Sequence, residues 1–94
     1  MNEISVMIPE NFITDEVNEF RKKLLYLISN GEKKFIIDFS KCNFIDSTGL
    51  GVLISIHKKC IELNASFKLF AVNNPSVIKI FELTRLSSVL KMEN

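Results

Sequence analysis

The stretch that decides the fold is Phe35 to Ile54, with the sequence FIIDFSKCNFIDSTGLGVLI. Apart from Asp38, residues 35–39 are large and β-branched apolar residues, which predicts a central strand covered on both faces. From Ser47 onward apolar residues recur at helical spacing, which predicts a helix that runs to about Asn64. The expected buried face of this helix consists of Leu50, Leu53, Ile54, His57, Cys60 and Ile61. A strand followed by a helix is the building unit of α/β folds.

The residues before this stretch predict another strand and helix. Apolar and other residues alternate over positions 4–8, as in a strand, and Pro9 closes the run because proline cannot donate to a β-ladder. Thr14 is placed to cap a helix with an acidic first turn, and Gly31 supplies its stop. One face of that helix is expected to carry Val17, Phe20, Leu24, Leu27 and Ile28.

The residues after this stretch complete the pattern. Residues 66–72 read as a strand, and Asn74 can cap a third helix that has Pro75 at its first position. A short final strand is expected over 88–92. The order β-α-β-α-β-α-β predicts an α/β fold with a mostly parallel four-stranded sheet and about three packed helices. Ninety-four residues fit one core, so residues 1–94 are expected to form a single domain.

Composition and charge exclude several classes of function. Twelve basic and eleven acidic residues give a formal net charge of +1, which provides no electrostatic footprint for direct contact with nucleic acid. The N-terminus lacks the pattern of a signal peptide, and no apolar run approaches the roughly 20 residues that span a bilayer. The expected location is therefore cytoplasmic, without direct membrane insertion.

The two cysteines do not indicate a redox or metal site. Cys42 and Cys60 are too far apart in sequence for a C-x-x-C pair, and they lack the histidine companions that a zinc site would need. We expect neither a metal nor a cofactor, and interpret both thiols as apolar or incidental.

Polar side chains that could carry a function cluster where the central strand leads into the second helix. Asp46, Ser47 and Thr48 place a carboxylate and two hydroxyls at a helix N-terminus, followed by Gly49, Leu50 and Gly51. Unpaired N–H groups and the helix dipole would stabilise a phosphoryl group there, whose charge is about −1.5 to −2. Capping by Ser47 or Thr48 explains the same residues, and on this chemistry alone it is the better explanation.

The segment Phe44-Ile45-Asp46-Ser47-Thr48-Gly49-Leu50-Gly51-Val52-Leu53 resembles the signature of STAS domains of the bacterial anti-sigma factor antagonist kind. The resemblance continues through the strand at 67–72 and the Asn74-Pro75-Ser76-Val77 helix start. At the beginning of the chain, Asn11 is the nearest counterpart of an aspartate that the family carries before its first helix.

The resemblance implies a phosphorylation switch. An anti-sigma factor that is also a serine kinase would phosphorylate Ser47, with Thr48 as the less favoured site, and a serine phosphatase would reverse it. The unmodified form would bind the anti-sigma factor and release a sigma factor. Asp46 would orient the hydroxyl, and the implied partner-binding residues are Asp46, Ser47, Thr48, Gly49, Leu50 and Gly51. ATP would belong to the kinase partner.

Other functions stay open at this point. A STAS module can also serve as a cytosolic subunit of a lipid-transport complex or in a stress-signalling assembly. Catalysis is not expected, because His57 lies on an apolar helix face and the first strand lacks the paired carboxylates that would join Asp38 and Asp46 in holding magnesium. Two glycines, Gly49 and Gly51, are too few for a phosphate-binding loop.

Overall fold

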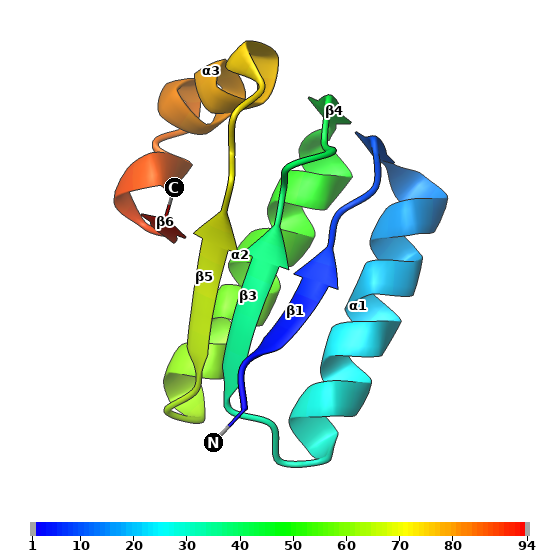
Figure 1. Cartoon of the computed structure of the whole chain (residues 1–94), viewed down its shortest axis with the longest axis vertical. Helices are drawn as coiled ribbons and strands as arrows, with labels where there is room; N and C mark the ends of the chain where they lie inside the picture. Colours follow the sequence, from blue (N-terminus) through cyan, green and yellow to red (C-terminus); the bar gives the residue numbers. More distant parts are fainter. Residues whose placement is uncertain (1, 94) are drawn as a thin grey trace.

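A computed structural model describes residues 2–93, which form a four-stranded sheet covered by helices. The sheet has the order β1-β3-β5-β6, and every neighbouring pair in it is parallel (Figure 1). Its strands are β1 (Ile4–Met7), β3 (Lys34–Asp38), β5 (Ser66–Phe70) and β6 (Lys91–Glu93). The predicted fold class, a mostly parallel four-stranded sheet with about three helices, is confirmed.

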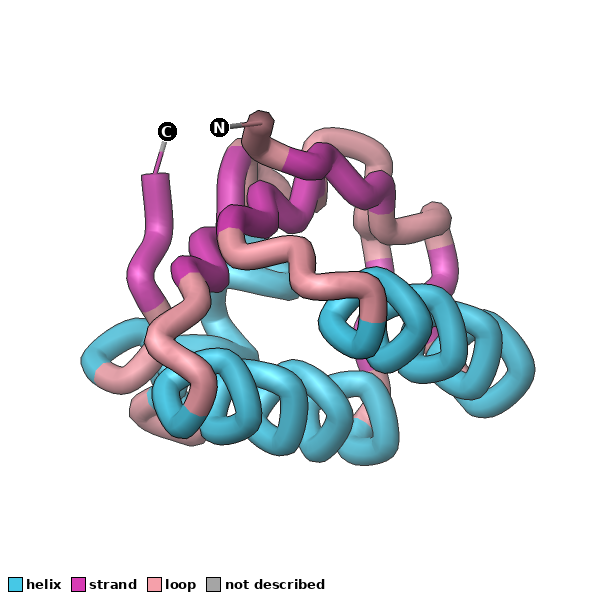
Figure 2. The backbone as a smooth tube through the Cα atoms, turned by 90° about the horizontal axis from the view of Figure 1, so that it is seen from below, coloured by secondary structure: helices cyan, strands magenta, loops and turns pink. Residues whose placement is uncertain are grey.

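Three α-helices connect the strands: α1 (Thr14–Ser29), α2 (Ser47–Glu62) and α3 (Pro75–Leu83). A single 3-10 turn, η1 (Leu86–Ser88), precedes β6. Figure 2 shows the helices gathered on one side of the sheet. This arrangement follows from the right-handed crossovers that parallel strands require.

The central strand is covered on one face, so the expectation of a doubly covered β3 was wrong. Phe35 and Ile37 are buried, whereas the alternating Ile36 and Asp38 are partly exposed. The burial patterns of β1 and β5 alternate in the same way. Because side chains of a strand point to opposite faces in turn, the helices lie over the face that carries Phe35 and Ile37.

A second, very small sheet was not predicted. It consists of β2 (Asn11–Phe12) and β4 (Phe44–Ile45), which pair in parallel with Asn11 opposite Phe44 and Phe12 opposite Ile45. Each strand of this pair ends one residue before the N-cap of a helix, α1 or α2. The pair therefore holds two helix starts side by side.

The starts of the first helix and of the last strand differ from the sequence expectation. Thr14 does not cap α1; it is the first helical residue, and Ile13 occupies the N-cap without a side-chain hydrogen bond. Residues 88–90 belong to η1 and the turn after it, so the last strand begins at Lys91. The predicted cap of α3 by Asn74, with Pro75 at the first position, is confirmed.

The buried face of α2 also differs from the one expected. Leu53 and Cys60 are buried as predicted, but Ile61 is 61% exposed and His57 is half-buried. Val52 and Ile56 take the buried positions, so the face is rotated toward α1 and the sheet. The predicted face of α1 is confirmed, with Leu27 at its half-buried edge.

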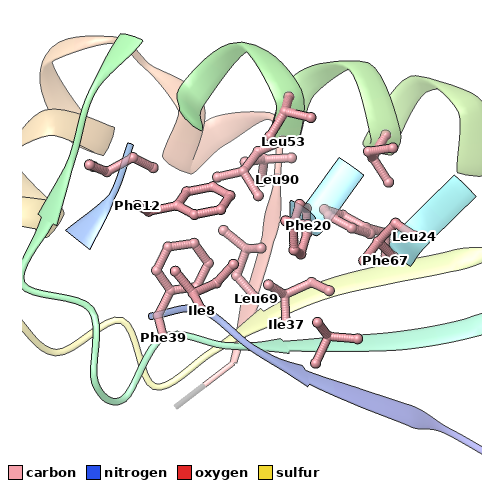
Figure 3. Packing of buried hydrophobic residues seen from close by; sticks show 14 of the residues in the cluster. Ile8, Phe12, Phe20, Leu24, Ile37, Phe39, Leu53, Phe67, Leu69 and Leu90 are labelled. Atoms are coloured by element: carbon pink, nitrogen blue, oxygen red, sulfur yellow. The ribbon is translucent and has the colours of Figure 1, made fainter. Parts of the chain in front are cut away.

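Aromatic side chains join the small sheet to the main core. Phe12 of β2 is fully buried and packs edge-on against Phe20 of α1, with ring centroids 5.3 Å apart. Figure 3 shows both rings among the buried side chains that lie between the sheet and the helices. Fully burying a side chain of this size contributes about 3 kcal/mol. The helix starts above this core are therefore firmly supported.

Candidate functional site

The junction between β4 and α2 lies at the carboxyl end of the parallel sheet (Figure 1). The backbone N–H of Asp46 donates to the carbonyl of Phe12 at 3.5 Å, which extends the β2–β4 pairing to the residue before the helix. Loops at this end of a parallel sheet are where α/β proteins usually place their functional groups. The structure thus puts Asp46, Ser47 and Thr48 on the edge where a partner can reach them.

Asp46 caps α2. Its Oδ1 atom accepts the Thr48 hydroxyl at 2.6 Å and the Gly49 backbone N–H at 3.0 Å. The Thr48 hydroxyl, and then the Gly49 N–H, hold the pKa of the Asp46 carboxyl below its usual range. Asp46 is therefore a stable negative charge, and its carboxylate holds the hydroxyl of Thr48 and not that of Ser47.

Ser47 is the first residue of α2, and its side chain is exposed. Among the hydrogen bonds of residues 2–93, none involves the Ser47 hydroxyl. Since Asp46 is the cap, capping does not account for a serine at this position. The exposed Thr48 differs, because its hydroxyl proton is committed to Asp46.

The two glycines of the junction have opposite surroundings. A Cβ atom on Gly49 would lie 2.8 Å from Ile45 Cγ1 and from Phe12 Cδ2, and 3.0 Å from the carbonyl oxygen of Phe12. Gly49 is buried and lets the first turn of α2 approach β2 and β4 closely. A Cβ on Gly51 would meet nothing within 4 Å. Leu50, between them, is half-buried.

The third helix begins next to the same site. Asn74, the N-cap of α3, accepts the backbone N–H groups of Ser76 and Val77, while its own Nδ2 donates to Asn43 Oδ1 at 3.3 Å. Asn43 precedes β4 directly. The cap was visible in the Asn-Pro sequence, but its partner was not, because a long-range side-chain contact leaves no periodic pattern.

Of the remaining candidates from the sequence, His57 and Asp38 have other surroundings, whereas Asn11 lies beside β4. His57 is half-buried with its ring centroid 6.2 Å from that of Phe67. Asp38 accepts the backbone N–H of Ser40 at 2.8 Å. Asn11 is exposed on β2 opposite Phe44, which places this family counterpart beside the β4 end.

Burial governs the chemistry of the cysteines. Both thiols are buried, and burial raises the pKa of Cys42 and of Cys60 above the usual value. Within residues 2–93, no three side chains of His, Cys, Asp or Glu gather as a metal site. No helix in this same part of the chain is both long and apolar enough to cross a bilayer.

Comparisons with known proteins agree with this geometry. Two proteins named anti-sigma-B factor antagonist, from Listeria monocytogenes and Listeria innocua, are each 31% identical over 58 residues. That match covers 62% of this chain and half the length of each Listeria protein.

Solved structures show the same fold. A crystal structure of a proposed anti-sigma factor antagonist from Thermotoga maritima superposes with a TM-score of 0.83 at 25% identity, over 96% of this chain and 79% of that one. The anti-sigma factor antagonist SpoIIAA in its unphosphorylated form gives a TM-score of 0.77 at 18% identity, over 98% of this chain and 79% of that one. The sequence profile of the STAS domain matches residues 3–94. The chain therefore belongs to the STAS domain family.

Proposed function

We propose that this chain is an anti-sigma factor antagonist, switched off by phosphorylation of Ser47. The observation that carries the proposal is the exposed Ser47 hydroxyl at the first position of α2, free of hydrogen bonds within the described chain. A hydroxyl that no neighbour holds can enter a kinase site without breaking a contact of the fold. The names of the Listeria and Thermotoga relatives support the same role.

The start of α2 suits a modified serine. Backbone N–H groups and the positive end of the helix dipole stabilise a phosphoryl group, so the fold need not change on phosphorylation. What changes is the surface, because a dianion appears beside the carboxylate of Asp46. A partner whose surface is complementary to the neutral hydroxyl would be repelled by the concentrated negative charge and would dissociate.

The proposed partner surface is the first two turns of α2. Asp46, Ser47, Thr48, Leu50 and Gly51 are exposed or half-buried and form its contacts. Gly49 is buried beneath them and supports the turn in place of touching the partner. The partner is an anti-sigma factor that is also a serine kinase and carries the ATP, and a serine phosphatase restores the hydroxyl. The proposed role is regulatory, not catalytic, and its place is the cytoplasm.

The assignment of the site is tested by locating the phosphate. The chain is incubated with the anti-sigma factor/serine kinase of its own organism and ATP, and the modified residue is identified by mass spectrometry. We expect phosphate on Ser47 in the wild type and none in Ser47→Ala. Thr48→Val, which keeps Ser47, should still be modified. Phosphate that persists on Ser47→Ala would contradict the assignment.

The release mechanism is tested by binding. Ser47→Asp should weaken binding of the anti-sigma factor by about tenfold or more while leaving the melting temperature nearly unchanged. Ser76→Asp is the matched control, since Ser76 is also exposed in the first turn of a helix, α3. Equal affinity of Ser47→Asp and the wild type would show that charge at this position does not release the partner.

A further inference from the structure

A groove runs between α1 and α2, next to the proposed phosphorylation site. It has a volume of about 340 Å³, and its lining includes Thr14, Asn18 and Arg21 from α1 and Thr48, Gly51 and Ser55 from α2. Thr48 follows Ser47 directly, so the groove begins one residue after the proposed switch residue. Polar uncharged side chains share the lining with the apolar Val17 and Val52, and Arg21 is the charged side chain among the residues that form it.

Gly51 is unexplained by the fold alone. It lies inside α2, where glycine is the least favourable residue apart from proline, and a Cβ there would meet no atom within 4 Å. Gly49 is needed for the packing of the chain itself, but Gly51 is not. A glycine that weakens its helix and faces an open groove is accounted for if another backbone comes close to it.

Arg21 gives the groove its charge preference. Its Nη2 donates to Asn18 Oδ1 at 2.9 Å on the exposed surface of α1, and the guanidinium keeps further N–H donors for a ligand. The acidic Glu16 and Glu19 of α1 line a different hollow, together with β1. A guanidinium held in this way binds carboxylates in a planar, two-point geometry.

We propose that the α1–α2 groove receives an acidic, extended segment of the anti-sigma factor, whose backbone passes over Gly51 and whose carboxylate pairs with Arg21. The inference rests on the proposed function. It adds the α1–α2 groove to the proposed interface with the anti-sigma factor, beside the start of α2. The Ser47 end provides the switch, and the groove provides affinity that phosphorylation does not directly alter.

Two variants test the groove from different sides. Gly51→Leu fills it with a side chain that favours helix, so the melting temperature should rise by about 4 °C while affinity for the purified anti-sigma factor/serine kinase falls about tenfold. A variant that is more stable and yet binds more weakly cannot owe its defect to misfolding. Arg21→Glu should also weaken binding about tenfold, by placing two carboxylates together.

Lys22→Glu is the matched control for charge, because Lys22 is exposed on α1 beside Arg21 in sequence and lies outside the groove. It should bind within about twofold of the wild type. The groove is rejected if Gly51→Leu and Arg21→Glu bind like the wild type while Ser47→Asp still releases the partner. A wild-type chain that does not bind the anti-sigma factor at all would overturn the proposed function together with the groove.

Discussion

The starts of α1 and α2 are built on the same backbone plan but have different chemistry. Each follows a two-residue strand of the β2–β4 pair, and each N-cap residue is extended, with ψ of −178° at Ile13 and −176° at Asp46. At both starts the N-cap carbonyl accepts the backbone N–H four residues later, that of Val17 in α1 and that of Leu50 in α2. Ile13 offers no side-chain cap, whereas Asp46 caps its helix and carries a charge. The two helix starts therefore share a backbone conformation, and only their side chains distinguish the candidate site from its counterpart.

The largest difference between the two starts should appear at their third helical positions. Gly49→Ala forces a Cβ against Phe12 and Ile45 and should lower the free energy of unfolding by about 1–3 kcal/mol. Glu16→Ala is the same position of α1, is exposed, and should change stability by less than about 0.5 kcal/mol. Chemical denaturation measures both. Similar losses for the two variants would mean that the close approach of α2 to the small sheet is not tight.

The missing cap of α1 gives the next largest effect. Threonine and valine have nearly the same shape, so Ile13→Thr and Ile13→Val lose similar packing, but only threonine can accept a hydrogen bond from the helix start. We expect Ile13→Thr to be more stable than Ile13→Val by about 0.5–1 kcal/mol in urea unfolding. The wild type serves as reference for the packing loss. Equal free energies of unfolding for the two variants would show that a side chain at the N-cap of α1 does not stabilise the helix.

The smallest expected effect is the loss of stability at acidic pH that is due to Asp46. The lowered pKa of Asp46 means that its charged form stabilises the folded state above the ordinary carboxyl pKa, about 3.9, and that this contribution is lost as pH falls through the folded pKa. Asp46→Asn keeps a capping oxygen but does not titrate. The wild type should therefore lose more melting temperature than Asp46→Asn between pH 6 and about pH 3. If the melting temperatures of the wild type and Asp46→Asn fall equally with pH, Asp46 is not the source of the acid sensitivity.

Periodicity predicted the main elements because long helices and strands repeat their contacts. It could not show β2 and β4, since two residues hold no period and their pairing is decided by contacts far along the chain. The face of α2 was misassigned for another reason: Val52 and Ile56 also recur at helical spacing, and periodicity alone does not decide which of two overlapping apolar faces is buried. The central strand looked doubly covered because Ile36 is apolar even on its partly exposed face.

The site was predictable in part. The hydroxyls, the carboxylate and the glycines were evident in the Asp46–Gly51 segment, but the choice among them was not. Only the structure shows that Asp46 is the cap, that the Thr48 hydroxyl donates to it, and that the Ser47 hydroxyl makes no hydrogen bond within residues 2–93. Arg21 was not predictable as a site residue, although Thr14, Asn18 and Arg21 follow helical spacing on α1, because a polar stripe on a helix is ordinarily a solvated face.

The parallel pairing of β2 with β4 means that the junction forms late in folding. Asn11 must find Phe44 across a complete helix and strand, so no local hairpin can nucleate the junction and its assembly waits on distant contacts. A short peptide that spans residues 44–53 would lack both β2 and the core that hold the start of α2, and helices of that length are barely stable in water. We therefore expect the kinase of the proposed switch to act on the folded chain better than on such a peptide.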